Sequence, residues 1–242
     1  MGFMTLFDNT CSVAIVTGAS RGFGKAVTAA LLDRGWAVVG DARRAFELKT
    51  TARELNSARL IALPGDVTDA SHRDALVGAA TSAGPLRLLV NNASRLGPSP
   101  QPALSDYPAS ELWAVYHTNV FAPLALIQAA LPALRSNAGV IVNLTSDAAV
   151  EPYRGWGGYG SSKAALDQLS AVLAAEEPTV PVYAFDPGDM RTEMHQAAFP
   201  DEDISDRVEP ESVVPALLRL LDTRPVSGRY RAADLLVSGV RP

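Results

Sequence analysis

The fold is decided by one stretch, Val13-Ala14-Ile15-Val16-Thr17-Gly18-Ala19-Ser20-Arg21-Gly22-Phe23-Gly24. Its first five residues form a short apolar run, rich in β-branched side chains, of the kind that fills a buried parallel strand. A turn with three glycines follows, and residues 25–34 then carry apolar side chains at helical spacing. The stretch therefore predicts a strand, a glycine turn and a helix in direct succession, which is how many α/β domains begin.

The glycine turn is also the first candidate binding site. Glycine lets the backbone turn sharply and come close to a pyrophosphate, which the positive end of the following helix attracts. A plain strand-to-helix loop that happens to hold three glycines is the alternative, but the strand before it and the helix after it favour a nucleotide site. We expect contacts with a nucleotide cofactor from Gly18, Ser20, Arg21, Gly22, Phe23 and Gly24.

The alternation of apolar runs and helical periods continues along the rest of the chain. Further strands are predicted at 37–40, 59–63, 86–90, 140–144, 180–185 and 227–236, and helices at 46–56, 71–83, 110–134, 159–175 and 210–221. This order predicts a doubly wound, mostly parallel sheet with helices on both faces, a Rossmann-like α/β fold. We expect a single domain over residues 1–242, with residues 1–11 as an N-terminal extension.

Composition narrows the classes of function. The 242 residues are 48% hydrophobic and 19% charged, enough for one sizeable core. A net charge of -5 leaves no basic stripe for nucleic acid, and a single cysteine excludes an intrachain disulfide and argues against a metal site. Because no window approaches the ~20 apolar residues of a membrane span and the first ten residues lack a signal-peptide pattern, we expect a cytoplasmic protein that acts on a small molecule, with no nucleic acid and no membrane.

A second motif carries the chemistry. In Gly158-Tyr159-Gly160-Ser161-Ser162-Lys163, the tyrosine and lysine are four residues apart and leave the same face of a helix. An ammonium beside a phenol stabilises the phenolate and lowers the phenol pKa, which would make Tyr159 usable in proton transfer. With three lysines and six tyrosines in the chain, a chance pairing at this spacing is rare.

These motifs resemble the short-chain dehydrogenase/reductase family over nearly the whole chain. The glycine spacing Gly-x-x-x-Gly-x-Gly, the segment Asn91-Asn92-Ala93-Ser94 and the Tyr-x-x-x-Lys pair carry the resemblance. It implies hydride transfer between a nicotinamide cofactor and a carbonyl or alcohol, with Tyr159 as acid/base and Lys163 lowering its pKa and binding ribose.

The resemblance implies two further catalytic residues. Ser146, thirteen residues before Tyr159, would orient the carbonyl oxygen, and Asn119 would complete a proton relay from Lys163. The alternatives are structural: Ser146 could cap a turn, and the amide of Asn119 could simply bond to backbone.

More cofactor contacts follow from the same resemblance. Adenine would lie against Asp66 and Val67, although a turn or cap role is the alternative for the Asp66 carboxylate. Six further contacts are implied with the adenosine, carboxamide and phosphate regions: Asn92, Ala93, Pro187, Gly188, Met190 and Thr192. Ser94 departs from the family, which usually has glycine there, and its Cβ would narrow the cofactor channel or move the following loop.

The residues at the end of the second predicted strand indicate whether the cofactor is NAD(H) or NADP(H). In the family an acid there binds a ribose 2′-hydroxyl, whereas an arginine just beyond it binds a 2′-phosphate. Ala42 takes the place of the acid, Arg43 follows it, and Arg21 supplies a second cation. We therefore expect NADP(H) rather than NAD(H), the alternative being that Asp41, one residue earlier, turns onto the ribose.

The remaining expectations concern substrate and assembly. The acid-rich segment 193–210 is predicted to be a lid over the substrate, and Tyr153, Trp156 and Phe199 to give the pocket a partly aromatic wall. The apolar helices at 110–134 and 159–175 predict a homodimer or homotetramer, with His117 at the surface or interface. An epimerase or dehydratase of the same fold, or a non-catalytic NADP(H) sensor, is the alternative to a carbonyl reductase.

Overall fold

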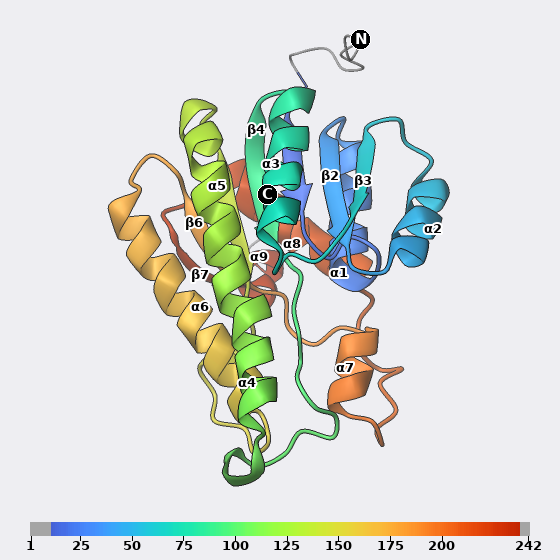
Figure 1. Cartoon of the computed structure of the whole chain (residues 1–242), viewed down its shortest axis with the longest axis vertical. Helices are drawn as coiled ribbons and strands as arrows, with labels where there is room; N and C mark the ends of the chain where they lie inside the picture. Colours follow the sequence, from blue (N-terminus) through green and yellow to red (C-terminus); the bar gives the residue numbers. More distant parts are fainter. Residues whose placement is uncertain (1–10, 238–242) are drawn as a thin grey trace.

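A seven-stranded sheet forms the centre of the computed structural model, which describes residues 11–237 (Figure 1). The strand order is β3-β2-β1-β4-β5-β6-β7, and every neighbouring pair is parallel. The doubly wound sheet predicted from the sequence is therefore confirmed, and it is parallel throughout the described residues. The predicted N-terminal extension, apart from Cys11, lies outside the described residues.

The bounds of the elements are as follows. The strands are β1 (Val13–Val16), β2 (Ala37–Ala42), β3 (Leu60–Pro64), β4 (Leu86–Asn91), β5 (Val140–Leu144), β6 (Val182–Asp186) and β7 (Gly228–Arg231). The α-helices are α1 (Gly22–Asp33), α2 (Ala45–Leu55), α3 (Ala70–Ala83), α4 (Ala109–Tyr116), α5 (Ala122–Ser136), α6 (Gly157–Glu176), α7 (Glu193–Ala198), α8 (Pro210–Thr223) and α9 (Ala232–Val237). Short turns of other helix types are η1 (Leu104–Asp106), η2 (His117–Phe121) and η3 (Asp147–Ala149).

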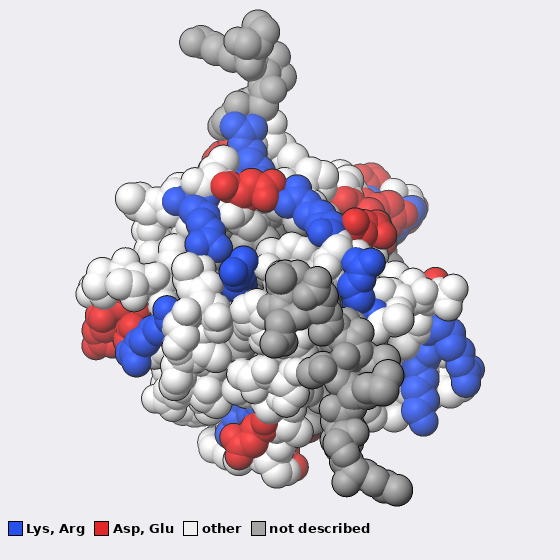
Figure 2. All heavy atoms as spheres, turned by 90° about the horizontal axis from the view of Figure 1, so that it is seen from above, with Lys and Arg blue, Asp and Glu red and all other residues white. Residues whose placement is uncertain are grey.

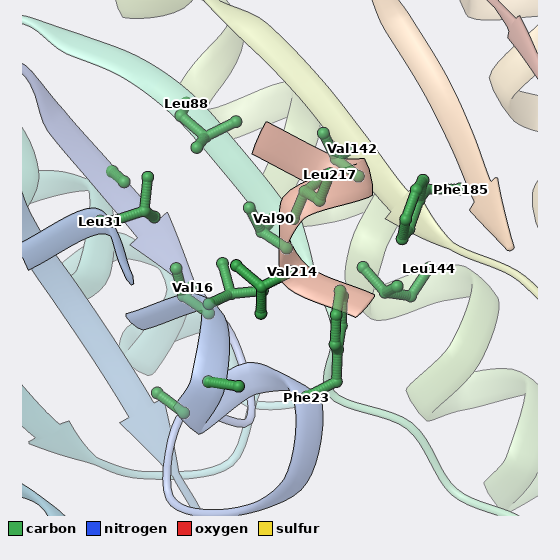
Figure 3. Packing of buried hydrophobic residues seen from close by; sticks show 14 of the residues in the cluster. Val16, Phe23, Leu31, Leu88, Val90, Val142, Leu144, Phe185, Val214 and Leu217 are labelled. Carbon is green, nitrogen blue, oxygen red and sulfur yellow. The ribbon is translucent and has the colours of Figure 1, made fainter. Parts of the chain in front are cut away.

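Strands β1, β2, β5 and β6 are buried along their whole length, which is why these segments are mostly apolar in sequence. In β1, Val13 and Ile15 join the core under α3 and α5, whereas Ala14 and Val16 join the core under α1 and α8. Figure 3 shows this second core. Full burial of a Val or Leu side chain contributes about 1.5–3 kcal/mol, so the two apolar layers hold the helices against the sheet.

The predicted last strand is wrong beyond its first residues. β7 ends at Arg231, and the rest of the predicted range 227–236 begins helix α9. The ladder between β6 and β7 pairs only Tyr183–Asp186 with Gly228–Arg231. The residues that follow include two alanines and two leucines, which favour helix once strand pairing ends.

Two other boundaries matter for function. β2 continues through Ala42, two residues beyond the prediction, so Asp41 lies inside the strand. The predicted helix at 110–134 is interrupted by the π-helical turn η2, which contains Asn119. Pro123 has no N–H to donate to the carbonyl of Asn119 four residues earlier, which favours a change of hydrogen-bond pattern at this point.

The continuous helical segment Ala109–Ser136 is long and apolar enough, by length and composition, to cross a membrane. The expectation that no window would approach this limit is therefore wrong. Half of the most apolar window is buried inside the protein. Packing of Leu126, Ile127, Ala130 and Leu134 in the core accounts for the apolar composition.

Charges of both signs alternate on the end of the molecule seen in Figure 2. Basic and acidic side chains lie next to one another there, and the described part of this face carries no continuous basic surface. The opposite end, where the strands have their carboxyl ends and where α4 and α7 lie, holds the candidate site (Figure 1).

Candidate active site

A cleft of about 520 Å³ opens at the carboxyl ends of the central strands. The glycine turn after β1 and the end of β2 form one part of its wall, and the start of α6 and the loop after β6 form another. The strand order reverses direction between β1 and β4, and in open α/β sheets this switch point is where ligands bind.

The glycine turn has the backbone geometry that a phosphate site needs. Gly18 adopts a φ of +68°, which side-chain-bearing residues rarely take. A Cβ on Gly24 would lie 2.3 Å from the carbonyl oxygen of Gly18, so α1 can begin against the turn only with glycine there. No side chain caps the N-terminus of α1. Its first N–H groups therefore remain available to an anion, and the turn fits the pyrophosphate of a dinucleotide.

Asn92 secures this turn from the neighbouring strand. Its Nδ2 donates to the carbonyl oxygens of Thr17, at 2.8 Å, and Gly18, at 3.2 Å. The Thr17 hydroxyl accepts in return from the backbone N–H groups of Asn92 and Ala93, each at 2.9 Å. Asn92 and Ala93 also line the cleft, and their contact with adenosine stays a prediction. Their observed hydrogen bonds hold the glycine turn in place.

Asp41 is held by the protein itself. Its Oδ1 accepts from the backbone N–H of Gly18 at 2.8 Å, and its Oδ2 lies 3.1 Å from Nε2 of His72. The side chain is buried, which raises the pKa of Asp41, while the hydrogen bond with His72 acts in the opposite direction. With both oxygens engaged, Asp41 supports the glycine turn, and the alternative that it binds a ribose is disfavoured.

Four cations line the part of the cleft near the glycine turn and the end of β2: Arg21, Lys25, Arg43 and Arg44. Arg21 forms an ion pair with Glu193 at the start of α7, and Arg44 forms one with Glu47 at 2.6 Å.

Asp66 and Val67 also line this side. Oδ1 of Asp66 accepts from both the backbone N–H and the hydroxyl of Thr68, at 2.9 and 2.8 Å. Arg73 donates to the carbonyl oxygen of Val67 at 2.7 Å. The turn role left open for Asp66 is thus present in the structure, and its contact with adenine stays a prediction.

Tyr159 and Lys163 lie together at the other part of the cleft wall, in the first two turns of α6. Nζ of Lys163 is 5.4 Å from the centre of the Tyr159 ring and donates to the carbonyl oxygen of Leu144 at 2.6 Å. Both side chains are nearly covered, at 8% exposed for Tyr159 and 2% for Lys163. A phenol and an amine therefore share one dry corner of the cleft.

The protein groups shift both pKa values toward the neutral forms. Burial raises the pKa of Tyr159, and a hydrogen bond with Ser94 acts against that rise. Burial also lowers the pKa of Lys163 to about 8. The buried phenol is therefore harder to ionise than a free one, and the predicted lowering of its pKa by Lys163 stays a prediction.

Ser146 and Asn119 make the structural contacts that were left open as alternatives. The Ser146 hydroxyl donates to Oδ1 of Asp147 at 2.9 Å and accepts from the backbone N–H of Ala148 at 3.2 Å, so it caps η3. Asn119 is fully buried and exchanges hydrogen bonds with the backbone of Arg95 at 2.8 and 2.9 Å. Neither side chain lines the cleft as described, and their catalytic roles stay predictions.

The loop after β6 contributes Pro187, Met190 and Thr192 to the cleft wall. Thr192 also caps α7, its hydroxyl accepting from the backbone N–H of His195 at 3.2 Å. Gly188 is not part of the wall. Its N–H donates to Oδ1 of Asp186 at 3.0 Å, a hydrogen bond within the loop after β6.

Aromatic rings join the predicted lid to the start of α6. Trp156 packs edge-on to Tyr159 with ring centres 5.8 Å apart, and its ring lies 5.6 Å from that of Phe199, just after α7. Tyr153 adds a third contact to Trp156 at 6.3 Å. The segment 193–210, predicted as a lid, therefore touches the predicted aromatic wall next to the phenol.

Sequence reasoning missed Arg229. Its guanidinium donates to the carbonyl oxygen of Ser146 at 3.0 Å, to Asp186 at 2.7 Å and to Asp167 at 3.2 Å. It thereby ties β7 to the ends of β5 and β6 and to α6. No local motif marks this arginine, because its partners are 43 to 83 residues away in the chain.

Among the described residues, no group of three or more His, Cys, Asp or Glu side chains could hold a metal ion.

Comparison with known proteins agrees with this geometry. A family model described as short chain dehydrogenase matches residues 12–203. The chain is 35% identical over 203 residues to sepiapterin reductase of Meriones unguiculatus, covering 78% of each chain. It is 33% identical over 215 residues to benzil reductase ((S)-benzoin forming) of Saccharomyces cerevisiae, covering 85% of this chain and 80% of the relative. A short chain dehydrogenase from Shigella flexneri, solved in complex with NADP, superposes with a TM-score of 0.85 at 28% identity, covering 95% of this chain and 99% of that one.

Proposed function

Because this chain belongs to the short-chain dehydrogenase/reductase family of oxidoreductases, we propose that it interconverts a ketone and a secondary alcohol with NADP(H), using Tyr159 as the acid/base. One observation carries the proposal. A single cleft joins a glycine turn and open helix N-terminus, which fit a dinucleotide phosphate, to the buried pair Tyr159 and Lys163.

The residues of the cleft divide the work between binding and proton transfer. The glycine turn and the N-terminus of α1 hold the pyrophosphate, and Lys163 holds the ribose next to Tyr159. Bound NADPH supplies the hydride that a carbonyl carbon accepts. Tyr159 donates its phenolic proton to the carbonyl oxygen, and its near-complete burial excludes competing water from that step.

The preference for NADP(H) is supported by the end of β2. Ala42 stands where an acid would bind the 2′-hydroxyl of NAD(H), and both oxygens of Asp41 are engaged with Gly18 and His72. Arg43, directly after the strand, and Arg21 are cations on the same part of the cleft wall. A 2′-phosphate would form charge-assisted hydrogen bonds with them.

For the substrate, we propose a ketone carried next to an aromatic ring. The ring of Trp156 packs against the phenol, and the rings of Tyr153 and Phe199 pack against Trp156. Aromatic side chains favour flat aromatic partners in offset or edge-on contact. The relative from Saccharomyces cerevisiae is a benzil reductase by name, and benzil carries two phenyl ketones.

A steady-state screen of NADPH oxidation tests the proposal. Benzil and other aryl ketones, a quinone, an aliphatic ketone and a sugar carbonyl are compared, each with NADPH and with NADH. We expect turnover of aryl ketones with the highest kcat/KM, and at least tenfold better with NADPH than with NADH. Tight NADPH binding without turnover of any carbonyl would contradict the reductase and favour a sensor.

The variant Trp156→Leu tests the proposed aromatic substrate class separately from the reductase activity. Loss of the indole should raise the KM of aryl ketones by about tenfold, since aromatic pairs contribute about 0.5–1.5 kcal/mol beyond area burial. The KM of an aliphatic ketone should change little. An equal effect on both ketones would contradict the aromatic substrate class and leave the reductase itself untouched.

A further inference from the structure

His72, near the start of α3, contacts one side of the Asp41 carboxylate. Its Nε2 lies 3.1 Å from Oδ2 of Asp41, whose Oδ1 accepts from the backbone N–H of Gly18 at 2.8 Å. An ionised carboxylate only accepts hydrogen bonds, so Nε2 of His72 is the donor. The carboxylate therefore has one oxygen on the glycine turn and the other on α3.

The contact between His72 and Asp41 is enclosed by protein. Only 10% of the His72 side chain and 2% of the Asp41 side chain are exposed. The imidazole packs against Gly65, directly after β3, where a Cβ would lie 2.2 Å from Nδ1 of His72. A side chain at position 65 would therefore displace the ring. The end of β3 thus provides space for His72 beside the end of β2.

The position of Asp41 links this contact to the cofactor. Asp41 lines the cleft next to Ala42 and Arg43, whereas His72 is not among the described residues of the cleft wall. A carboxylate free to turn at the end of β2 would accept from a ribose 2′-hydroxyl and would repel a 2′-phosphate. Both effects would favour NAD(H). The hydrogen bonds from His72 and Gly18 engage both oxygens of Asp41 and hold the carboxylate away from the ribose.

We propose that His72 is a positioning residue for cofactor selection, which commits Asp41 to the glycine turn and so maintains a preference for NADP(H), a role that rests on the proposed use of that cofactor. His72 acts only through Asp41 and touches neither cofactor nor substrate. A buried carboxylate oxygen without a donor is unfavourable. Loss of the imidazole would therefore leave Oδ2 of Asp41 to take its hydrogen bond from the hydroxyl of a bound ribose.

The contact itself can be measured without cofactor. In protein labelled with ¹⁵N in the histidine rings, each imidazole gives signals that report which nitrogen carries the proton, and His72→Gln assigns those of His72. At alkaline pH we expect the proton of His72 on Nε2 in the wild type, and a loss of this preference in Asp41→Ala. The signals of His195, in α7, are the internal control and should not move.

The second test measures the dissociation constants of NADPH and NADH by fluorescence titration. In His72→Leu the ratio of the NADH constant to the NADPH constant should fall by about tenfold, the scale of one hydrogen bond to a charged group. His72→Gln keeps an N–H donor at a similar reach and should restore the wild-type ratio. His72→Asn, whose amide is shorter, should behave like His72→Leu and replaces it if the leucine variant does not fold.

A double variant shows whether His72 acts through Asp41. Adding His72→Leu to Asp41→Ala should change the ratio by less than about twofold, because the carboxylate that His72 positions is then absent. Ala75→Leu places the same side chain at an exposed position of α3. This control should leave both dissociation constants unchanged.

Three results would overturn the proposal. Equal weakening of both cofactors in His72→Leu would make His72 a structural support of the turn alone. A change of ratio that persists in the Asp41→Ala background, or that His72→Gln does not reverse, would exclude action through this hydrogen bond. His72 signals that do not respond to Asp41→Ala would exclude the contact. A wild type that binds NADH more tightly than NADPH would instead contradict the proposed cofactor, and the changes of ratio between variants would still report on His72.

Discussion

At the scale of single residues, burying the charged ammonium of Lys163 costs folding free energy. Lys163 is 2% exposed, and its Nζ is held by one backbone carbonyl, that of Leu144. Burial lowers the pKa of Lys163 from about 10.5 to about 8. The charged form is therefore destabilised in the folded protein, although the proposed chemistry needs this charge beside the cofactor.

We predict that Lys163→Met unfolds at a higher temperature than wild type near pH 7. At that pH the native lysine is charged, and the pKa difference between 10.5 and about 8 corresponds to a cost of about 3 kcal/mol. Between about pH 8 and 10.5 the unfolded chain binds more protons than the native one, so wild-type stability rises and the gap closes. Thermal unfolding at both ends of this window measures it, with Lys49→Met, an exposed lysine, as the control. A variant that is less stable near pH 7 would contradict the assigned cost.

At the same scale, we propose that Arg43 selects NADP(H) over NAD(H). Replacement by Ala should weaken NADPH binding by about tenfold or more, since a hydrogen bond to a charged group contributes about 1.5–3 kcal/mol, and leave NADH binding nearly unchanged. Fluorescence titration with both cofactors measures it. Arg53→Ala removes the same charge from an exposed position of α2 and should affect neither. Equal weakening of both cofactors would make Arg43 a general surface cation.

At the scale of elements, the start of α7 is paired with a cation that we propose binds the cofactor. Glu193 forms an ion pair with Arg21, the second arginine assigned to the 2′-phosphate. Phe199, at the other end of α7, packs on Trp156 beside Tyr159. The predicted lid is thus bound both to the glycine turn and to the aromatic wall, and a phosphate on Arg21 would release its first attachment.

Glu193→Gln should therefore tighten NADPH binding by about two- to fivefold at low salt. The estimate follows from the 0.2–1 kcal/mol that exposed ion pairs contribute. NADH binding, which involves no 2′-phosphate, should not change. Glu202→Gln removes the same charge from the same segment at an exposed position and is the matched control. An identical gain for NADPH in both variants would indicate only a general electrostatic effect of the acid-rich segment.

The helices and strands also differ in how well the sequence predicts them. The apolar run 13–17 and the glycines after it define β1 and its turn because both signals are local. The end of β2 is not visible in the same way, since pairing with β3 extends the strand through Asp41 and Ala42. The contacts of Ser94 and Arg229 join segments far apart in the chain, and no periodicity reports them. Tyr159 and Lys163 could be chosen because one helical turn relates them. The pKa of the phenol could not be predicted, since it depends on burial by distant segments.

At the scale of the whole molecule, large apolar side chains remain uncovered on the helices predicted to form an interface. Trp113 is 62% exposed, Phe121 52% and Val172 42%. Trp113 also stacks on His117, with ring centres 4.6 Å apart. Contact with a second copy of the chain would cover these side chains, as the sequence predicts.

We predict a solution mass of at least twice that of one chain at micromolar concentration. Light scattering measures it, and Phe121→Glu should shift the mass toward that of a monomer because a carboxylate would be buried in the interface. Phe46→Glu changes a more exposed phenylalanine, on α2, and should leave the mass unchanged. A monomeric wild type would contradict the assembly without affecting the assignment of the cleft.

The proposed chemistry depends on the phenol of Tyr159, and one paired measurement tests it most directly. Tyr159→Phe removes the proton donor and almost preserves ring volume and packing, so NADPH should bind within about twofold of wild type. Turnover of an aryl ketone should fall by about 10²-fold or more, the scale of general acid catalysis, and adding Lys163→Met should lower it little further because both changes disable one step. A Tyr159→Phe protein that binds NADPH normally and keeps wild-type kcat would contradict the account and require another proton donor.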